Sequence, residues 1–272
     1  MAEYSNFHTH SVFCDGRDTL EDIVLQAIGL GCRQLGFSSH APMRFEADWC
    51  MTELSELEYK KEVLSLKRKY AGTIEILLGI ELDYFSDTDT SDYDYVIRSV
   101  HSVLKNGCYL PIDDSEQSQR NAVERYYGAD YTGFARDYYA LVGKITQGAR
   151  CDVIGHFDLI TKYNEGDRLF DTSCEAYRRL ALEAIDAIFE DGNAHPIFEY
   201  NTGAISRGHR TSGYPAEFIL DYLSQRYRGR YSFLINSDAH SKENLLFGFE
   251  EARSILLRYG TEICYSFPFG AK

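Results

Sequence analysis

The first apolar segment of the chain is Ser5-Asn6-Phe7-His8-Thr9-His10, and Asp15-Gly16 begins five residues later. Two histidines at positions i and i+2 of an extended segment project from the same face, so both imidazoles can reach one ion. A single pair of this kind arises by chance in many proteins. This pair is informative because the same arrangement, an apolar run that leads into histidine or carboxylate side chains, recurs along the chain and indicates the fold.

The later segments share this pattern of an apolar, β-prone run with histidine or carboxylate within it or after it. They are Leu35-Gly36-Phe37 before Ser38-Ser39-His40-Ala41-Pro42, Leu77-Leu78-Gly79-Ile80-Glu81-Leu82-Asp83, Ile97-Arg98-Ser99-Val100 before His101, Val153-Ile154-Gly155 before His156 and Asp158, and Phe233-Leu234-Ile235-Asn236 before Ser237-Asp238-Ala239-His240. A single histidine at a strand end is more often a hydrogen-bonded core residue, and His195 and His209 fit that interpretation or plain exposure. Glutamate is almost never buried without a partner, so Glu81 indicates a cluster.

Strands and helices are predicted to alternate along the chain. Strands are predicted at residues 5–8, 34–38, 74–84, 95–100, 153–156, 197–201 and 232–236, and helices at 20–30, 53–70, 134–147, 174–190, 215–226 and 242–259. Asp18-Thr19 and Ser173 stand where N-caps belong, and Pro215 suits a first helical turn. The alternation indicates a parallel α/β sheet, and the polar residues after so many strands favour a barrel over a doubly wound sheet. The polar, tyrosine-rich residues 109–132 are interpreted as an active-site loop or lid.

Composition excludes several classes of function. The chain has 272 residues, 44% of them apolar, with no linker or low-complexity tract and no apolar run near the roughly 20 residues of a membrane span. Residues 1–6 show no signal-peptide pattern and the seven cysteines are scattered, so a cytoplasmic protein with reduced thiols is expected. The net charge of −14 lacks the positive footprint of nucleic-acid binding. No pattern in the sequence indicates an oligomeric state.

The types of ligand select the chemistry of the predicted cluster. Imidazole and carboxylate without thiolate suit Zn, Fe or Mn, held with open positions for water and substrate. Eight or nine donor side chains exceed the needs of one ion, so two to three divalent ions are implied. A bridging carboxylate such as Glu81 could hold two ions about 3.5–4 Å apart, the spacing used for in-line displacement at phosphorus.

With these residues assembled, the chain resembles the polymerase-and-histidinol-phosphatase (PHP) family, and within it the monofunctional histidinol-phosphate phosphatase subgroup. The motifs occur in family order from end to end: His8-Thr9-His10 with Asp15-Gly16, Phe37-Ser38-Ser39-His40-Ala41-Pro42, Gly79-Ile80-Glu81-Leu82-Asp83-Tyr84, Ser99-Val100-His101, Ile154-Gly155-His156-Phe157-Asp158-Leu159 and Ser237-Asp238-Ala239-His240. Glu199-Tyr200-Asn201-Thr202-Gly203, followed by Tyr214-Pro215, is similar to the segment that precedes the last metal motif of the subgroup.

The resemblance implies a distorted (β/α)7 TIM-like barrel with a trinuclear centre, formed by one PHP metal-dependent phosphoesterase domain over residues 1–272. Carried over motif by motif, the first ion would be held by His8, His10, Glu81 and Asp238. The second would be held by Glu81 as a bridge, His101 and His156, and the third by Asp15, His40 and His240. Asp15 stands where some family members have histidine. The residues predicted to act directly in catalysis are Glu81, Asp238 and His240.

Members of the subgroup bind the substrate phosphate with basic residues near the fifth and sixth metal motifs. The candidates in this chain are Arg207, in Ile205-Ser206-Arg207, and Lys162, in Leu159-Ile160-Thr161-Lys162. Lys162 departs from related chains, which often have arginine in this neighbourhood, and a lysine offers a point charge instead of a bidentate fork. Arg210 is an alternative to Arg207, and the sequence does not choose between them.

The predicted function is hydrolysis of L-histidinol phosphate to L-histidinol and phosphate, a step of histidine biosynthesis, with a metal-bridging hydroxide that attacks phosphorus. The substrate rests on the resemblance, and the expected partner is a small phosphomonoester. The alternatives are a PHP phosphoesterase with another small substrate, a nuclease, and a non-catalytic metal-binding scaffold. An aspartyl-nucleophile phosphatase is rejected because Gly166-Asp167 does not follow an apolar strand, and a cysteine-nucleophile phosphatase because no cysteine has arginine six residues later.

Overall fold

The computed structural model describes residues 4–45, 47–192 and 195–267. Within these residues, the main sheet has eight parallel strands in the spatial order β1-β2-β3-β4-β7-β8-β9-β10. Their bounds are β1 Ser5–Asn6, β2 Gln34–Phe37, β3 Glu75–Asp83, β4 Tyr95–Ser99, β7 Val153–Ile154, β8 Ile197–Asn201, β9 Ser232–Asn236 and β10 Glu262–Ile263. A separate antiparallel pair, β5 (Ser102–Lys105) and β6 (Cys108–Pro111), follows β4 along the chain.

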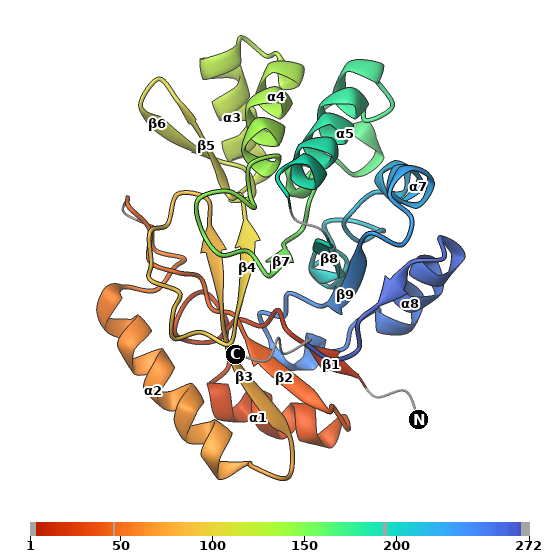
Figure 1. The fold of residues 1–272 in the computed structure, drawn as a ribbon. Coiled ribbons are helices and arrows are strands. Elements are labelled where there is room, and N and C mark those ends of the chain that lie inside the picture. The colour runs from red at the N-terminus through yellow and green to blue at the C-terminus, as the bar shows by residue number, and fades with distance from the viewer. Residues whose placement is uncertain (1–3, 46, 193–194, 268–272) are drawn as a thin grey trace.

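Helices connect the strands and surround the curled sheet (Figure 1). They are α1 Leu20–Gly29, α2 Glu53–Lys69, α3 Glu116–Tyr127, α4 Tyr131–Val142, α5 Glu175–Glu190, α6 Gly203–Ser206, α7 Glu217–Arg226 and α8 Phe249–Arg258, with short 3-10 turns at Leu159–Thr161, Glu165–Asp167 and Lys242–Asn244. This confirms the predicted fold class, an α/β TIM-like barrel. None of the helices in the described ranges combines the length and apolar character that crossing a membrane requires.

The barrel closes at a weak seam between its first and last predicted strands. The segments that leave β1 and β9 are joined by a parallel bridge between Thr9 and Ala239. The Ala239 carbonyl accepts a hydrogen bond from the His10 amide at 2.9 Å, and the Ala239 amide donates to the His8 carbonyl at 3.2 Å. At the opposite end of β9, the short strand β10 pairs with Ser232 and Phe233. The seam therefore makes the barrel distorted and places His8 and His10 directly opposite the motif after β9.

Tyr95 fills the interior of the barrel below the motif-bearing strand ends. Its ring is fully buried, and its hydroxyl donates to the carbonyl of Phe7 at 2.5 Å or of Phe37 at 3.1 Å. A Cβ atom at Gly36 would lie 2.3 Å from this hydroxyl oxygen, and one at Gly79 would lie 2.1 Å from the ring. The absence of a side chain on β2 and β3 at these two positions is thus what lets the Tyr95 ring cross the barrel.

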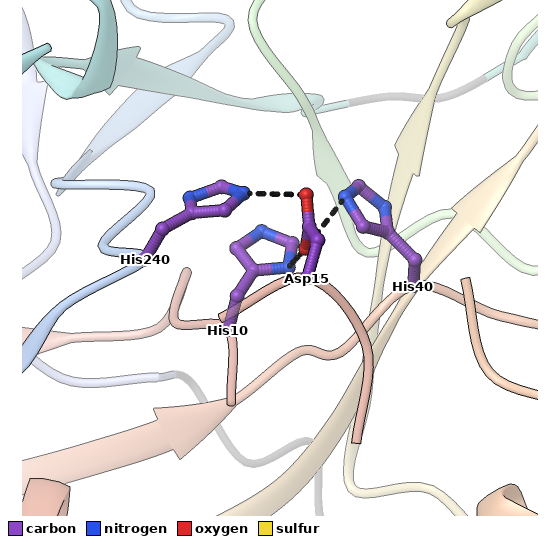
Figure 2. A group of neighbouring side chains, drawn as sticks. All are labelled: His10, Asp15, His40 and His240. Atoms are coloured by element: carbon purple, nitrogen blue, oxygen red, sulfur yellow. Dashed lines mark hydrogen bonds and ion pairs between the residues drawn. The ribbon is translucent and has the colours of Figure 1, made fainter. Parts of the chain in front are cut away.

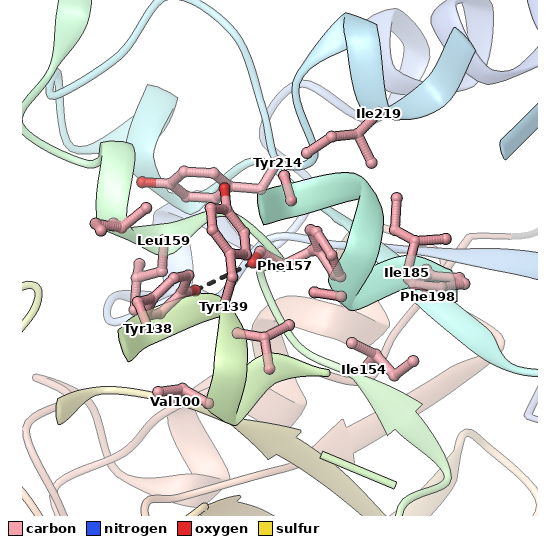
Figure 3. Packing of buried hydrophobic residues seen from close by; sticks show 14 of the residues in the cluster. Val100, Tyr138, Tyr139, Ile154, Phe157, Leu159, Ile185, Phe198, Tyr214 and Ile219 are labelled. Atoms are coloured by element: carbon pink, nitrogen blue, oxygen red, sulfur yellow. Dashed lines mark hydrogen bonds between the residues drawn. The ribbon is translucent and has the colours of Figure 1, made fainter. Parts of the chain in front are cut away.

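Apolar residues from the sheet and the outer helices form the rest of the core. On α5 the buried positions are Tyr177, Ala181, Ala184, Ile185, Ile188 and Phe189, which follow helical spacing and define one face. This face and α4 pack over β7 and β8, where Phe157 and Phe198 lie among Tyr138, Tyr139 and Ile185 (Figure 3). The strands are thereby covered on both sides, so their polar carboxyl ends are the accessible part.

The interpretation of residues 109–132 as an active-site loop or lid was wrong about their structure, although Pro111, Asp113 and Asp114 of this segment do line the cavity described below. The segment contains most of β6, all of α3 and the start of α4. Helix α3 is capped at its start by Ser115, whose hydroxyl accepts a hydrogen bond from the Ser118 amide at 3.1 Å, and at its end by Gly128 in the left-handed conformation. Only Gln119, Ala122 and Val123 of this helix are buried. Because so few residues of α3 are buried, polar residues dominate its sequence, and the apolar periodicity that would predict a helix is missing.

Several helices also begin or end at other residues than predicted. The helix predicted at 134–147 is α4, which is shifted toward its N-terminus, and the one predicted at 242–259 begins only at Phe249, after a 3-10 turn. Thr19 caps α1 as predicted, by accepting a hydrogen bond from the Asp22 amide. Ser173 is not the cap of α5, because the cap position is Cys174 and Ser173 bonds Asp171 instead. Pro215 precedes α7, whose cap position is Ala216.

Candidate metal centre

The nine side chains predicted as ligands lie together at the carboxyl ends of the strands. They arrive after β1, β2, β4, β7 and β9, and one comes from within β3. In the described part of the chain, four overlapping groups have ligand atoms within 4.8 Å of one another: His10, Asp15, His40 and His240; His8, Glu81 and His156; His8, His10 and Asp238; and His40, Glu81 and His101. The structure thus brings together every member of the predicted set.

Glu81 lies at the centre of the cluster and faces different imidazoles with its two oxygens. Its Oε2 lies 3.1 Å from His8 Nε2 and 2.9 Å from His40 Nδ1. Its Oε1 lies 3.2 Å from His101 Nε2 and 3.0 Å from His156 Nε2. Only 1% of Glu81 is exposed to solvent. A carboxylate placed in this way can bridge two cations, with one oxygen toward each set of imidazoles.

The unpartnered atoms of the cluster indicate that cations fit there. His8 Nε2, His10 Nε2 and Glu81 Oε2 are buried and make no hydrogen bond. A buried polar atom without a hydrogen bond is costly, so each one requires an explanation. The donor set is nitrogen and oxygen without thiolate, which suits divalent ions such as Zn, Fe or Mn. The residues present therefore fit such ions, because the donor atoms are of the right type and the unpartnered atoms face one another.

Asp15 lies between His10, His40 and His240 (Figure 2). Its Oδ2 lies 3.1 Å from His240 Nε2, and its Oδ1 lies 3.7 Å from His10 Nδ1 and 3.8 Å from His40 Nε2. Burial raises the Asp15 pKa, but the interactions with His40, His240 and His10 outweigh burial and hold it well below its usual range. A third of the Asp15 side chain is exposed, so this group is the one nearest to an entering ligand.

Asp238 joins the ligand cluster to a basic residue. Its Oδ1 lies 3.2 Å from His10 Nε2 and 3.7 Å from His8 Nε2, while its Oδ2 accepts a hydrogen bond from Arg207 Nη2 at 2.9 Å. A Cβ atom at Gly203 would lie 2.8 Å from the same oxygen, so the glycine makes room for Asp238. The Asp238 backbone has a φ of 48°, in the left-handed region.

The electrostatics of the cluster separate its carboxylates from its imidazoles. Burial raises the Glu81 pKa, but His8, His40 and His101 lower it by more than burial raises it. The net pKa lies well below the usual value, so the carboxyl group stays ionised. Burial lowers the His101 pKa, and the charges of Glu81 and Asp83 outweigh this and raise it well above its usual value. His10 behaves in the opposite way, because burial together with His240 and His40 lowers its pKa to about 3. Neutral His10 is thus available as a ligand over the whole physiological range.

Asp83 was not predicted as a site residue, although it belongs to the same strand as Glu81. Its Oδ2 accepts hydrogen bonds from the His101 amide at 2.8 Å and from His101 Nδ1 at 3.2 Å. The bond to Nδ1 turns His101 Nε2 toward Glu81. The signal was present in the sequence, since a second carboxylate two residues after Glu81 in an apolar strand also needs a buried partner.

A cavity of about 290 Å³ opens above the cluster. Seven of the nine predicted ligands and also Arg207 and Lys162 line it. The remainder of the wall is Asp48, Trp49, Ser102, Pro111, Asp113, Asp114 and Leu159. Pro111, Asp113 and Asp114 belong to the segment that was predicted to lie at the site, whereas Asp48 and Trp49 were missed, because they come from a connection whose position depends on the tertiary fold.

The three basic residues predicted to bind phosphate occupy different places. Arg207 bonds the Asp238 carbonyl, Asp238 Oδ2 and His240 Nδ1 at 2.8–2.9 Å. Three of its five N–H groups are used in this way, which leaves two for a ligand. Lys162 lines the same cavity, where its ammonium group donates to the carbonyl and the carboxylate of Asp113. Arg210 bonds Thr161 and lines a separate cavity beside Asp158, so it does not reach the cluster.

Three comparisons place the chain among known proteins. A probable histidinol-phosphatase of Deinococcus radiodurans is 30% identical over 264 residues, which cover 93% of this chain and 92% of that protein. The crystal structure of a putative histidinol phosphatase from Listeria monocytogenes superposes with a TM-score of 0.77 at 21% identity, over 91% of this chain and 99% of the other. A crystal structure of histidinol phosphate phosphatase from Lactococcus lactis, in complex with zinc, L-histidinol and phosphate, gives a TM-score of 0.70 at 18% identity, over 96% and 95%.

The structural likenesses confirm the barrel fold, and the family follows from the sequence. The model of the PHP domain matches residues 6–203, a range that begins in β1 and ends at the start of α6. It therefore contains seven of the nine clustered side chains, and the last two, Asp238 and His240, follow β9 outside it. The match covers well over half of the sequence, and the chain belongs to the PHP domain family.

Proposed function

We propose that this protein is a metal-dependent phosphomonoesterase that hydrolyses L-histidinol phosphate to L-histidinol and inorganic phosphate. The observation that carries the proposal is Glu81, whose two oxygens face two sets of imidazoles beneath a cavity with a basic wall. The match to the D. radiodurans relative, a probable histidinol-phosphatase, covers nearly the whole length of that protein. The L. lactis structure contains zinc, L-histidinol and phosphate. Together these observations support the substrate class.

The nine clustered side chains are proposed to hold two to three divalent ions, of which Zn, Fe and Mn suit the donors. Such ions supply Lewis-acid chemistry and make water a nucleophile near neutral pH. Glu81 would share its oxygens between two ions, and Asp238 would add its Oδ1 on the side of His10. Asp15, His40 and His240 would hold the ion nearest to solvent. The protein's own contribution is to keep these carboxylates ionised and to direct the imidazole nitrogens inward.

Arg207 is proposed to bind the phosphoryl group of the substrate. Its guanidinium group is fixed by Asp238 and His240 and lines the cavity, so its two remaining N–H groups can bind a ligand without a further loss of side-chain freedom. These donors would neutralise charge on the phosphoryl oxygens as it develops during displacement. Lys162 is proposed to contribute a weaker, point-like charge, because Asp113 already accepts two of its three N–H donors.

The acidic and aromatic part of the cavity wall suits the leaving group of the proposed substrate. Asp48, Asp113 and Asp114 provide negative charge, and Trp49 offers an aromatic face beside His40 and His101. Burial raises the Asp113 pKa, but the charges of Lys162, His101 and His156 outweigh burial and lower this pKa to about 2. The carboxyl group of Asp113 therefore stays charged at neutral pH. An amino alcohol with an imidazole ring is complementary to the negative charge and the aromatic face of this wall.

A steady-state comparison of phosphomonoesters tests the proposal. The protein loaded with Zn, Mn or Fe would be assayed with L-histidinol phosphate, p-nitrophenyl phosphate and several sugar phosphates, with its metal content measured in parallel. We expect the highest kcat/KM for L-histidinol phosphate. Replacement of Glu81 by Gln should abolish metal binding and turnover together, because the bridging carboxylate is lost.

Other outcomes would assign the protein to another function. Metal binding with a preference for a different phosphomonoester would retain the chemistry and reject the substrate. Degradation of single-stranded DNA at a rate above that of small esters would indicate a nuclease. Bound metal without turnover of any ester would indicate a metal-binding scaffold. Full activity of the Glu81→Gln variant would overturn the metal-dependent mechanism itself.

A further inference from the structure

Glu199 is a fully buried carboxylate on β8 that faces the underside of the metal cluster. It is 0% exposed and does not line the cavity. Its Oε2 accepts hydrogen bonds from His8 Nδ1 at 2.8 Å and from Asn236 Nδ2 at 3.0 Å. Its Oε1 accepts from the His156 amide at 2.6 Å and from Asn201 Nδ2 at 2.9 Å. Two carboxylate oxygens offer about four acceptor positions, so the capacity of Glu199 is fully used.

The hydrogen bond to Glu199 determines which nitrogen of His8 faces the cluster. An ionised carboxylate accepts hydrogen bonds only, so the His8 Nδ1 carries the proton. The other nitrogen, Nε2, then lies 3.1 Å from Glu81 Oε2 and makes no hydrogen bond of its own. With the proton fixed on Nδ1, a neutral His8 presents its Nε2 lone pair to the place between Glu81 and Asp238.

The same carboxylate holds together the strands that supply the ligands. His156 follows β7, and its amide is bonded directly to Glu199. Asn236 ends β9, and its side-chain oxygen also accepts a hydrogen bond from the Phe7 amide at 3.0 Å. Asn201 ends β8, and its side-chain oxygen accepts from the Gly203 amide at 2.8 Å. Glu199 therefore connects the ends of β1, β7, β8 and β9, and so supports the seam at which the Thr9–Ala239 bridge joins the segments after β1 and β9.

We propose that Glu199 is a positioning residue for the metal centre, which acts through His8 and the His156 backbone and touches neither ion nor substrate. The proposal rests on the metal binding proposed above. It assigns a role to Glu199-Tyr200-Asn201, because the two polar residues of this segment point to the same side of β8 and bond each other. Partners of this kind orient ligand imidazoles, and their loss typically costs about 10–100-fold in metal affinity.

The Glu199→Gln variant tests the proposal with a nearly isosteric change. A glutamine has one accepting oxygen and one donating nitrogen, so it cannot accept all four hydrogen bonds. If its oxygen serves the His156 amide, its nitrogen meets His8 Nδ1, and His8 must move its proton to Nε2 to accept that bond. A protonated Nε2 cannot bind an ion. We expect about 10–100-fold weaker Zn binding in chelator competition at constant pH, and a changed visible spectrum of the Co-loaded protein.

Asp158→Asn is the matched control. Asp158 is also a fully buried carboxylate, at the start of the 3-10 turn after β7, but it accepts a hydrogen bond from the Ala216 amide and lies 3.9 Å from Arg210. We expect the Zn affinity of the Asp158→Asn variant, and the visible spectrum of its Co-loaded form, to match those of the original protein. Thermal unfolding with and without Zn separates positioning from plain stability. A positioning role reduces the Zn-induced rise in Tm of Glu199→Gln, whereas a structural role lowers the Tm of the metal-free protein and leaves the rise unchanged.

The outcomes are distinguishable from a failure of the proposed function. If the unmodified protein binds no divalent ion, the metal site itself is rejected. If the unmodified protein binds Zn and Glu199→Gln binds it equally well, only the role of Glu199 is rejected. If the variant does not fold, nitrogen NMR of the Zn-loaded original protein decides: a proton on His8 Nδ1 and Zn on Nε2 supports the proposal, and the reverse overturns it.

Discussion

Arg207 and Arg210 are three residues apart, yet only one of them lies in the cavity above the cluster. Replacement of Arg207 by Ala removes the two free N–H donors, and hydrogen bonds to a charged group contribute about 1.5–3 kcal/mol each. We expect kcat/KM for the phosphomonoester to fall by at least about 10-fold, because each 1.4 kcal/mol corresponds to a factor of ten. Steady-state kinetics at matched metal content measures this effect.

Arg210→Ala is the control for that variant. Its guanidinium group packs over the Tyr214 ring and bonds Thr161 outside the cavity, so its loss should change stability and leave kcat/KM within about threefold. A larger loss of kcat/KM in Arg210→Ala than in Arg207→Ala would reverse the assignment. The sequence could not make this choice, because Arg207 ends the short helix α6 and Arg210 follows in a turn, and their directions depend on that local geometry.

His101 provides a second test of how carboxylates orient the imidazoles. Replacement of Asp83 by Asn retains the size of the side chain but gives it a donating nitrogen, so the two bonds from the His101 amide and Nδ1 to one oxygen are disturbed. We expect about 10-fold weaker metal binding, with a smaller loss at the sites that do not use His101. Metal stoichiometry by titration measures it. Unchanged stoichiometry and affinity would show that His101 needs no such support.

The positions of the nine clustered residues could be predicted because parallel strands end at one edge of a sheet. A histidine after β1 and another after β9 must then approach each other, whatever the intervening sequence. The roles of Asp83, Glu199 and Trp49 could not be assigned in the same way. Asp83 and Glu199 interrupt apolar strands, which shows only that they need partners, and the partners come from other strands. Trp49 lies in a connection whose course the sequence pattern does not determine.

The strands β2 and β3 each contain a glycine that faces Tyr95. Replacement of Gly79 by Ala would place a Cβ atom 2.1 Å from the Tyr95 ring, which has no exposed surface and no space to move. Overpacking of a core costs about 1–3 kcal/mol and sometimes more, so we expect a loss of about 3 kcal/mol in the free energy of unfolding. Denaturant unfolding followed by circular dichroism measures it.

Gly29→Ala is the matched glycine control on a helix. A Cβ atom at this position would meet nothing within 4 Å. Gly29 is the last residue of α1, and its φ is not positive. We therefore expect an unchanged protein or a gain of up to about 0.5–1 kcal/mol, since alanine has the higher helix propensity. If Gly79→Ala were as stable as Gly29→Ala, the close approach of Tyr95 to β3 would be refuted.

The strands with continuous apolar runs could be predicted well, and elements with few buried apolar residues mostly could not; α2, with only Tyr59, Val63 and Leu66 buried, is an exception. Every strand that carries a motif was located, since the apolar runs are continuous and both faces of the sheet are covered. Helix α3, the pair β5–β6 and the strand β10 were not. These elements have few buried residues, so tertiary contacts decide their structure, and periodicity alone does not reveal them.

The barrel as a whole is closed at its base by the segment after β10. Phe267 is 6% exposed, and its ring packs against Phe7 at 5.7 Å and Tyr95 at 5.0 Å between centroids. Replacement of Phe267 by Ala should cost about 3–5 kcal/mol of stability, as for other buried aromatic residues. Phe247→Ala, at a position that is 42% exposed, should stay within about 0.5 kcal/mol of the original protein. Equal effects of the two variants would show that the segment does not close the barrel.

The stability of the metal-free protein should depend on pH through the cluster. Burial lowers the His8 pKa, but Glu199, Glu81 and Asp238 outweigh burial and raise it well above the usual value, as Glu81 and Asp83 do for His101. For a raised folded-state pKa, the stabilisation is complete below the unfolded value of about 6.5 and is lost as pH rises through the folded value. The metal-free protein should therefore lose stability between about pH 7 and pH 8.

The metal-loaded protein should behave differently over the same interval, because the ions replace these protons and the imidazoles are neutral throughout. The stability added by the metal should thus increase with pH, by up to about 1.4 kcal/mol per pH unit for each proton that binding displaces. His10, whose pKa is about 3, does not titrate in this interval, and groups outside the cluster contribute equally to both forms. Denaturant unfolding at pH 7 and pH 8, with chelator and with Zn, measures the difference. A difference that stays constant or shrinks as pH rises would show that His8 and His101 do not give up protons to the ions.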